Sequence, residues 1–271
     1  MSAMTSRPWS ELDESAARGV LGVFTDIDDT LTSAGAIGED ALGALERLQA
    51  AGIHVVAITG RPMGWSEPFA NAWPVDAIVA ENGAVALFRE NGTLRIEYAQ
   101  DEPTRANNTR RLGAVATQLL REVPGATLAR DSAGRVTDIA IDHAEFAQLP
   151  PQRIDQVVAL MSAAGMNATV SSIHINGWFG THTKLSGARW MVQRLYGRAL
   201  DAELARWVYV GDSTNDQLMF AHFPLSVGVA NLRQFEAQLE VWPRFITQCE
   251  RGRGFAEVAD ALLRARASQP S

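Results

Sequence analysis

The chain has 271 residues, of which 46% are apolar, and it carries a formal net charge of −7. This size allows one large domain or two smaller ones with full hydrophobic cores. The negative charge and the lack of a basic cluster argue against a nucleic-acid partner, so any anionic ligand must be held by a local positive site. The single cysteine, Cys249, excludes an internal disulfide framework and fits a reducing compartment.

Neither a signal peptide nor a membrane segment is expected. The first 20 residues are polar and acidic and contain no apolar stretch. The longest apolar runs are much shorter than the roughly 20 residues that a membrane helix needs. We therefore expect no membrane association and a cytoplasmic location.

The two ends of the chain predict strands that alternate with helices. Residues 20–28 ("VLGVFTDID") are an apolar run that predicts a buried strand with an acidic end. Residues 39–51 place three leucines on one stripe, which predicts a helix, and Gly52 follows where a C-terminal cap belongs. Further buried strands are predicted at 53–60, at the beginning of 75–84, within 205–216 and at 224–231. This alternation predicts an α/β fold with a parallel sheet covered on both faces.

The middle of the chain predicts a different kind of unit. A hairpin is expected at 84–99, because Asn91 and Gly92 form a favoured tight turn between apolar runs. The elements expected after it are a helix at 103–122, a second hairpin at 127–142, a helix at 150–165 and one or two strands within 167–177. We interpret this series as a separate α+β domain inserted at about 87–178.

Four polar clusters lie at predicted strand ends or at a helix start. They are "DIDDT" (26–30), "TGR" (59–61), "THTK" (181–184) and "GDSTND" (211–216). Ligands of parallel α/β sheets bind beyond the carboxyl ends of the strands. A solvated acidic turn is a reasonable alternative for one such cluster alone, but four of them in this arrangement favour an active site.

The carboxylates of these clusters suit phosphoryl chemistry with a metal ion. Asp26 and Asp28 point to the same side of an extended segment. One of them could attack phosphorus while the other exchanges a proton with the leaving oxygen. Together with Asp212 and Asp216 they remain ionised only if a cation compensates them, and oxygen ligands beside phosphate favour Mg²⁺.

Two further positions could bind the phosphoryl oxygens. Thr59 can donate a hydrogen bond from its hydroxyl group, as can the backbone amides of Gly60 and Arg61 that follow it. Lys184 stands at the start of a predicted helix and would add a fixed positive charge.

These clusters resemble the four motifs of the haloacid dehalogenase-like hydrolase superfamily, in its phosphatase branch. "DIDDT" matches the first motif, the threonine of "ITGR" the second, Lys184 the third and "GDSTND" the fourth. The position of the insert resembles the large α/β cap (type IIB) of sugar phosphatases and phosphomannomutases. The resemblance implies a Rossmann-like core at 1–86 and 179–271 and a cap at 87–178.

The resemblance also implies a role for each motif residue. Asp26 would be the nucleophile that forms an aspartyl-phosphate, and Asp28 the general acid/base, with its carbonyl also reaching Mg²⁺. Asp26 and Asp212 would bind the metal directly, and Asp216 through water or as support. The residues that would hold the phosphoryl group or order the metal loop are Thr59, Lys184 and Asn215. Dehalogenases of the superfamily lack the second aspartate and its transport ATPases have threonine there, so Asp28 favours phosphate esters.

Substrate-reading residues are expected where the chain returns from the insert, at 172–184. The candidates are His174, Asn176, Trp178 and His182. The alternatives are that Trp178 packs the hinge and that His182 lies on the surface. Arg61 could contact a phosphate or carboxylate of the substrate, or form a surface salt bridge instead.

The leading hypothesis is a Mg²⁺-dependent phosphatase that acts on a small phosphorylated sugar or sugar-acid ester. Mannosyl-3-phosphoglycerate, sucrose-phosphate and trehalose-phosphate phosphatases are the nearest analogies within the superfamily. The alternatives are a phosphomutase with the same cap class and a non-catalytic sugar-phosphate sensor. Asp28 argues against a sensor, which has no need of a general acid. The expected partner is therefore a small phosphorylated metabolite, and the sequence indicates no oligomeric state.

Overall fold

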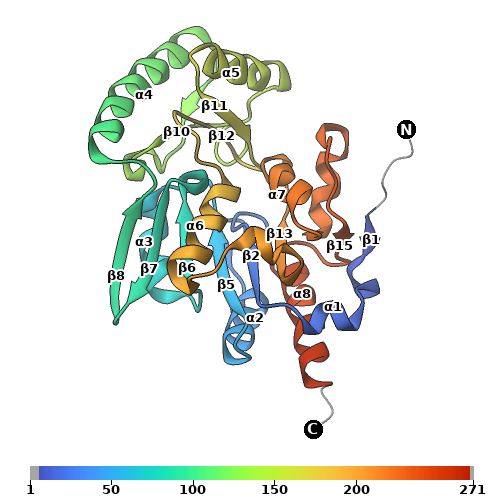
Figure 1. Ribbon diagram of the computed structural model, residues 1–271. Helices are drawn as coiled ribbons and strands as arrows, with labels where there is room; N and C mark the ends of the chain where they lie inside the picture. The colour runs from blue at the N-terminus through green and yellow to red at the C-terminus, as the bar shows by residue number, and fades with distance from the viewer. Residues whose placement is uncertain (1–5, 269–271) are drawn as a thin grey trace.

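The computed structural model describes residues 6–268. These residues form two parts of different size (Figure 1). The outermost ends of the predicted core, residues 1–5 and 269–271, lie outside the described residues. A large sheet with helices on both faces forms the lower part of the view, and a smaller sheet with two helices forms the upper part. The predicted α/β class, with a mainly parallel sheet and an added α+β unit, is confirmed.

Nine strands within residues 6–268 form the main sheet. In spatial order they are β1 (Arg7–Pro8), β15 (Phe245–Ile246), β14 (Leu225–Gly228), β13 (Trp207–Gly211), β2 (Gly22–Thr25), β5 (His54–Ile58), β6 (Ala77–Ala80), β7 (Val85–Glu90) and β8 (Thr93–Tyr98). The strands from β1 to β6 in this order are parallel, and β7 and β8 are antiparallel to their neighbours. The carboxyl ends of β2, β5 and β13 therefore meet at one edge of the sheet.

Helices cover both faces of the main sheet, which explains its continuous apolar strands. Val23 of β2 packs into the cluster on one face, whereas its neighbour Phe24 packs into the cluster on the other. The first face is covered by α1 (Glu14–Arg18), α2 (Glu39–Ala50), α3 (Met63–Ala72) and α8 (Arg251–Ala267). The second face is covered by α6 (Lys184–Tyr196) and α7 (Gln217–His222).

The smaller sheet and its two helices form the cap. Its antiparallel strands are, in order, β11 (Asn167–Val170), β12 (His174–Trp178), β10 (Asp138–Asp142) and β9 (Thr127–Leu128). Side chains alternate along β12, so Ile175 packs against α4 (Glu102–Glu122) and α5 (Pro151–Ala163). His174 and Asn176 therefore lie on the opposite face of this sheet, toward the core.

The hairpin of β7 and β8 belongs to the main sheet, although we expected it at the start of the insert. Its tight turn is as predicted, since Asn91 and Gly92 both have positive φ values, of 53° and 78°. However, the short helix η2 (Glu81–Gly83) reverses the chain after β6, so that β7 pairs back onto β6. We therefore propose that the insert begins after Tyr98, and that the chain crosses between core and cap at 99–101 and at 179–183.

The remaining elements are short. A two-stranded ribbon, β3 (Thr32–Ser33) with β4 (Ala36–Ile37), follows the first acidic cluster. The other 3₁₀ helices are η1 (Trp9–Glu11), η3 (Ser132–Gly134), η4 (Leu200–Ala202), η5 (Leu204–Arg206), η6 (Thr214–Asp216) and η7 (Ala230–Gln238). Within residues 6–268, the helices lack the combination of length and apolar character that crossing a bilayer requires.

Gly83 allows the backbone of the core to lie close to the crossing at 179–183, which leads into α6. It has a φ of +108°, and a Cβ atom there would lie 2.1 Å from the carbonyl oxygen of Thr183. Gly92 has a φ of +78° but open space around it. A substitution of Gly92 therefore carries the cost of the backbone conformation without the cost of a clash.

We expect Gly83→Ala to destabilise the protein much more than Gly92→Ala. The Gly92 variant should lose about 1–2 kcal/mol of unfolding free energy through its backbone conformation. The Gly83 variant should lose about 1–3 kcal/mol more, because the backbone must move to remove the clash. Denaturant unfolding of both variants measures this difference, and equal losses would contradict the close approach.

Candidate active site

A buried cluster of three aspartates and one lysine lies at the carboxyl edge of the main sheet. Asp26 follows β2 and Asp212 follows β13, and their carboxylates lie with that of Asp216 within 4.8 Å of one another. Lys184, the first residue of α6, places its Nζ 2.7 Å from Asp26 Oδ1 and 2.7 Å from Asp216 Oδ1. All four side chains are nearly inaccessible to solvent. The fold thus brings together residues from three of the four polar clusters.

Asp216 uses both of its carboxylate oxygens to hold its neighbours. Its Oδ1 accepts hydrogen bonds from Lys184 and from the Tyr209 hydroxyl group. Its Oδ2 accepts the backbone N–H groups of Asp212 and Ser213, at 2.9 and 3.2 Å. Asp216 therefore shapes the loop after β13 and positions Lys184, which fits the supporting role that the family resemblance implies.

Asp26 and Asp212 keep more of their acceptor capacity. Asp212 accepts only long contacts from side chains, 3.4 Å from Thr30 Oγ1 and 3.4 Å from Asn231 Nδ2. Burial raises the pKa of Asp26 to about 7, an effect that Lys184 opposes and Asp216 reinforces. Burial and the charge of Asp26 likewise raise the pKa of Asp212. A cation would relieve this crowding, and a set of oxygen donors suits Mg²⁺.

Thr59 and Gly60 lie immediately after β5, next in the sheet to β2. The Thr59 hydroxyl oxygen accepts the backbone N–H of Arg61 at 3.0 Å, which orients its O–H for a different acceptor. The Gly60 carbonyl oxygen accepts hydrogen bonds from Arg135 at 3.0 Å and from Asn176 at 3.2 Å. Both donors belong to the cap, so the predicted phosphate loop also anchors the cap.

Asp28 faces Arg61 and not the cluster around Lys184. The Arg61 guanidinium donates to both Asp28 carboxylate oxygens at 2.9–3.0 Å. The same guanidinium contacts Glu145 at 2.7 Å and Asp131 at 3.2 Å, and both of these are cap residues. The Arg61 side chain is only 5% exposed, so the sequence alternative of a surface salt bridge does not describe it. Arg61 instead joins the predicted general acid/base to the cap.

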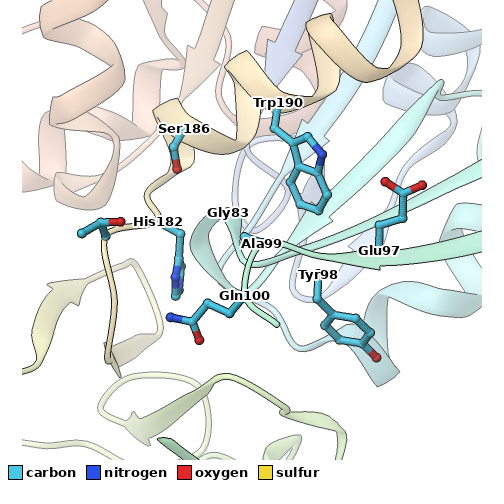
Figure 2. Close-up of a pocket in the computed structure, with 9 residues that line it drawn as sticks. Gly83, Glu97, Tyr98, Ala99, Gln100, His182, Ser186 and Trp190 are labelled. Carbon is cyan, nitrogen blue, oxygen red and sulfur yellow. The ribbon is translucent and has the colours of Figure 1, made fainter. Parts of the chain in front are cut away.

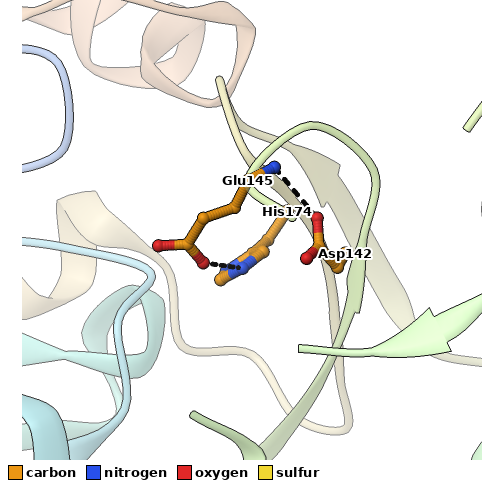
Figure 3. Close-up of side chains that lie close together, drawn as sticks. All are labelled: Asp142, Glu145 and His174. Carbon is orange, nitrogen blue, oxygen red and sulfur yellow. Dashed lines mark hydrogen bonds and ion pairs between the residues drawn. The ribbon is translucent and has the colours of Figure 1, made fainter. Parts of the chain in front are cut away.

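His174 and Asp142 fix Glu145 in this position (Figure 3). His174 Nε2 lies 2.9 Å from Glu145 Oε2, and the Asp142 carboxylate accepts the backbone N–H groups of Glu145 and Phe146. Burial would raise the pKa of Glu145, but the hydrogen bonds from His174 and Arg61 lower it to about 2. The three side chains are close enough to hold a metal ion. However, the hydrogen bonds that they already make hold the loop at 142–146 in place, and these bonds explain why the three side chains lie together.

A pocket of about 360 Å³ opens beside Asp28, between the core and this loop. Its polar and aromatic lining includes Asp28, Asp29, Arg61, Glu145, Phe146 and Arg251. The volume lies in the range of small-molecule sites. The pocket is therefore large enough to hold a small molecule beside Asp28.

Asp29 and Arg251, which both line this pocket, form an ion pair. Arg251 Nε donates to Asp29 Oδ1 at 2.9 Å, and both residues have positive φ values, of 52° and 53°. Asn231 supports the pair, because it donates to the Asp29 carbonyl oxygen and accepts the backbone N–H of Arg251. The side chain of Asn231 also contacts Asp212, so it connects the pocket with the aspartate cluster.

Three of the predicted site residues do not line the pocket beside Asp28: Trp178, His182 and Asn215. Trp178 is buried, and its Nε1 donates to the His182 carbonyl oxygen at 3.0 Å. The two rings stack with centroids 5.7 Å apart, in and beside the crossing at 179–183. Asn215 accepts a hydrogen bond from Ser213 within the loop after β13. A substrate contact of these residues remains a prediction.

Several residues of the site were missed by sequence reasoning. Asn231 lies three residues beyond the end of β14, so the search for polar residues at strand ends could have found it. Glu145 lies in a loop of the cap and Arg251 at the start of a helix remote in sequence. No spacing or motif singles out either residue, and only the folded chain brings them to Arg61 and Asp29.

Comparison with known proteins agrees with the motifs. Residues 23–105 match the family described as haloacid dehalogenase-like hydrolase. No curated protein matches the sequence. Residues 23–105 contain the first two motifs, so the match covers Asp26, Asp28 and Thr59.

Solved structures with a similar fold extend over most of the chain. The sucrose-phosphatase from Synechocystis sp. PCC6803, in complex with sucrose and phosphate, has a TM-score of 0.64 at 17% identity and covers 89% of this chain and 97% of its own. The C-terminal domain of C. albicans trehalose-6-phosphate phosphatase has a TM-score of 0.66 at 14% identity and covers 96% and 99%. The HAD subclass IIB sugar phosphatase BT4131 has a TM-score of 0.57 at 16% identity and covers 91% and 97%.

These structures cover both parts of the chain, the sheet core and the cap, and the family match includes Asp26 of the aspartate cluster. The resemblance expected from the four motifs is confirmed. Residues 23–105 of the chain thus match the haloacid dehalogenase-like hydrolases, and the chain has a fold similar to that of the sugar phosphatases among the solved structures.

Proposed function

We propose that this hydrolase is a Mg²⁺-dependent phosphatase for a small phosphorylated sugar or sugar-acid ester. The observation that carries the proposal is the placement of Lys184 between Asp26 and Asp216, with Asp212 beside them. A buried lysine can offset charge on a phosphoryl group, and a neighbouring carboxylate can attack it. The chain has one cysteine, Cys249, and so cannot form an internal disulfide. This composition fits a reducing compartment and supports a cytoplasmic location.

Asp26 is the nucleophile in this proposal. Its carboxylate attacks phosphorus and forms an aspartyl-phosphate, which water then hydrolyses. Lys184 and the Thr59 hydroxyl group hold phosphoryl oxygens while the bond to the leaving oxygen breaks. Asp26 and Asp212 would hold a Mg²⁺ ion, which when bound would supply positive charge to offset the charge on those oxygens.

Asp28 exchanges the proton with the leaving oxygen and then with the attacking water. Arg61 occupies both carboxylate oxygens of Asp28, so Arg61 must release Asp28 before Asp28 can reach the leaving oxygen. Glu145 offers Arg61 a second carboxylate at 2.7 Å. A substrate that enters the pocket beside Asp28 can therefore move Arg61 toward Glu145 without leaving a buried charge unpaired.

The leaving group lies in the pocket beside Asp28. Polar side chains with both charges can bind sugar hydroxyl groups or a carboxylate, and Phe146 can cover an apolar face of the ring. The names of the structurally similar proteins, sucrose-phosphatase and trehalose-6-phosphate phosphatase, support a sugar phosphate as the class to test first.

A panel of phosphate esters tests the activity and the nucleophile together. The wild-type protein should hydrolyse at least one sugar phosphate, and Asp26→Asn should lose more than about 95% of turnover, since an amide cannot attack phosphorus. Asp201→Asn is the control, because Asp201 pairs with Arg189 on the surface. Release of phosphate is the measurement, and substantial turnover by the Asp26 variant would exclude the covalent mechanism.

Removal of the metal should silence the enzyme reversibly. EDTA should abolish phosphate release, because the crowded carboxylates then repel the substrate, and Mg²⁺ should restore it. Ca²⁺ should restore it poorly, since its looser coordination misplaces the reacting groups. Full activity after exhaustive metal removal would count against the assignment.

Glu145→Gln should separate substrate recognition from chemistry. The substitution preserves the size of the side chain but removes the charge that receives Arg61. We expect kcat/KM for the preferred sugar phosphate to fall by about tenfold or more. Hydrolysis of p-nitrophenyl phosphate should change by less than about threefold, because p-nitrophenolate leaves with little need of a proton from Asp28 and has no sugar for the cap to bind. Equal losses on both substrates would assign Glu145 a general structural role.

A further inference from the structure

A second pocket lies on the hinge, away from the residues beside Asp28 (Figure 2). It has a volume of about 600 Å³, and its lining includes Glu97, Tyr98, Gln100, His182, Ser186 and Trp190. The lining combines the end of β8, both crossings between core and cap, and the first turns of α6. We call it the hinge pocket. Its volume lies well within the range of small-molecule sites.

His182 gives the hinge pocket two polar atoms that are not satisfied. The residue is 5% exposed, and neither ring nitrogen has a hydrogen-bond partner among the described residues. Burial lowers the pKa of His182 to about 4, so near neutral pH its ring offers one N–H donor and one acceptor. Unpaired polar groups of this kind are rare in interiors and are costly unless something binds to them.

The charges around the hinge pocket favour an uncharged ligand. Of the lining residues that the structure describes, none is a lysine or arginine. The carboxylate of Glu97 is paired with Arg194 at 3.0 Å and can still accept a hydrogen bond from a hydroxyl group. Arg105 lies over the Tyr98 ring, 3.9 Å from its centroid, and donates to the Gln100 carbonyl oxygen, so this cation is already engaged beside the pocket and the Glu97 carboxylate faces the ligand.

Two aromatic rings line the other side of the hinge pocket. Trp190 projects from α6 and Tyr98 stands at the end of β8, across the opening from His182 (Figure 2). Aromatic rings with polar edges suit ligands that have both an apolar face and hydroxyl groups. Sugars have this combination, with C–H bonds on one face of the ring and hydroxyl groups around it.

We propose that the hinge pocket binds an uncharged mono- or disaccharide. Its ring lies against Trp190 and Tyr98, and its hydroxyl groups bond to Glu97 and, once the imidazole turns toward the ligand, to the His182 nitrogens. Gly83 also lines the pocket and touches Thr183, the capping residue of the helix that begins with Lys184. A sugar there contacts both crossings and the segment that positions Lys184. The proposal rests on this pocket alone and not on the proposed phosphatase activity.

Titration with neutral sugars tests the proposal. The full-length protein is titrated with D-glucose, D-mannose and sucrose, and binding is followed by saturation-transfer NMR and calorimetry. At least one sugar should bind saturably, with a Kd of about 1–10 mM. His182→Leu and Trp190→Leu should each weaken that binding by about tenfold or more.

Two controls distinguish the hinge pocket from the pocket beside Asp28. Phe146→Ala changes the other pocket and should leave the sugar Kd within about twofold. His182→Leu removes two unpaired polar atoms, so the sugar-free variant should melt at the wild-type temperature or higher, which excludes misfolding as the cause. If Trp190→Leu does not fold, His182→Leu decides the outcome. Absence of saturable binding up to about 100 mM, or loss of binding in Phe146→Ala but not in His182→Leu, would overturn the proposal.

Discussion

The buried contacts of Lys184 with Asp26 and Asp216 are the constraint around which the catalytic edge is built. A lysine and carboxylates removed from water are stable only when each has its partner in place, and breaking such a pair costs about 3–5 kcal/mol. Neighbouring residues hold Lys184 and Asp216 in the positions that this pairing requires. Thr183 and Ser186 form a capping box that fixes the first turn of α6, and with it Lys184. At Gly211 a Cβ atom would lie 2.4 Å from Asp216 Oδ2, so the approach of this carboxylate requires glycine there.

The seam between core and cap is made largely of charges and backbone hydrogen bonds. The Glu81 carboxylate of the core accepts the backbone N–H groups of Val136 and Thr137 in the cap. Arg135 of the cap reaches the Gly60 carbonyl oxygen. Such contacts can be exchanged for water more readily than a large apolar interface. The seam is therefore suited to repeated opening, as an enzyme with a buried reaction site requires.

Much of the catalytic edge could be predicted from sequence because its residues lie at strand ends or at a helix start. Asp26, Thr59 and Asp212 directly follow the apolar strands β2, β5 and β13, and the parallel sheet brings such ends together. Lys184 begins a helix whose apolar stripe is plain in the sequence. The α/β class followed from the same pattern of strands and helices.

The errors and omissions have physical causes of a different kind. The hairpin of β7 and β8 has the same local signal in either domain, and only its pairing with β6 assigns it to the core. Glu145 and Arg251 act through long-range contacts that leave no periodic pattern. Arg61 was identified as a candidate from the sequence. Its simultaneous contacts with Asp28 and with the cap were not predicted, because they too depend on long-range contacts.

The hydrogen bonds of Asn231 have a thermodynamic consequence. This side chain contacts Asp212, which we assign to the metal, and it also holds Asp29 and Arg251, which line the neighbouring pocket. Two binding events that share one rigid connector influence each other by the same free energy in both directions. A ligand that rearranges the Arg251 ion pair therefore changes the affinity for the cation, and cation binding changes the affinity for that ligand by an equal factor. Asn231 is therefore the residue through which a metal ion at Asp212 would be coupled to a ligand in the pocket beside Asp28.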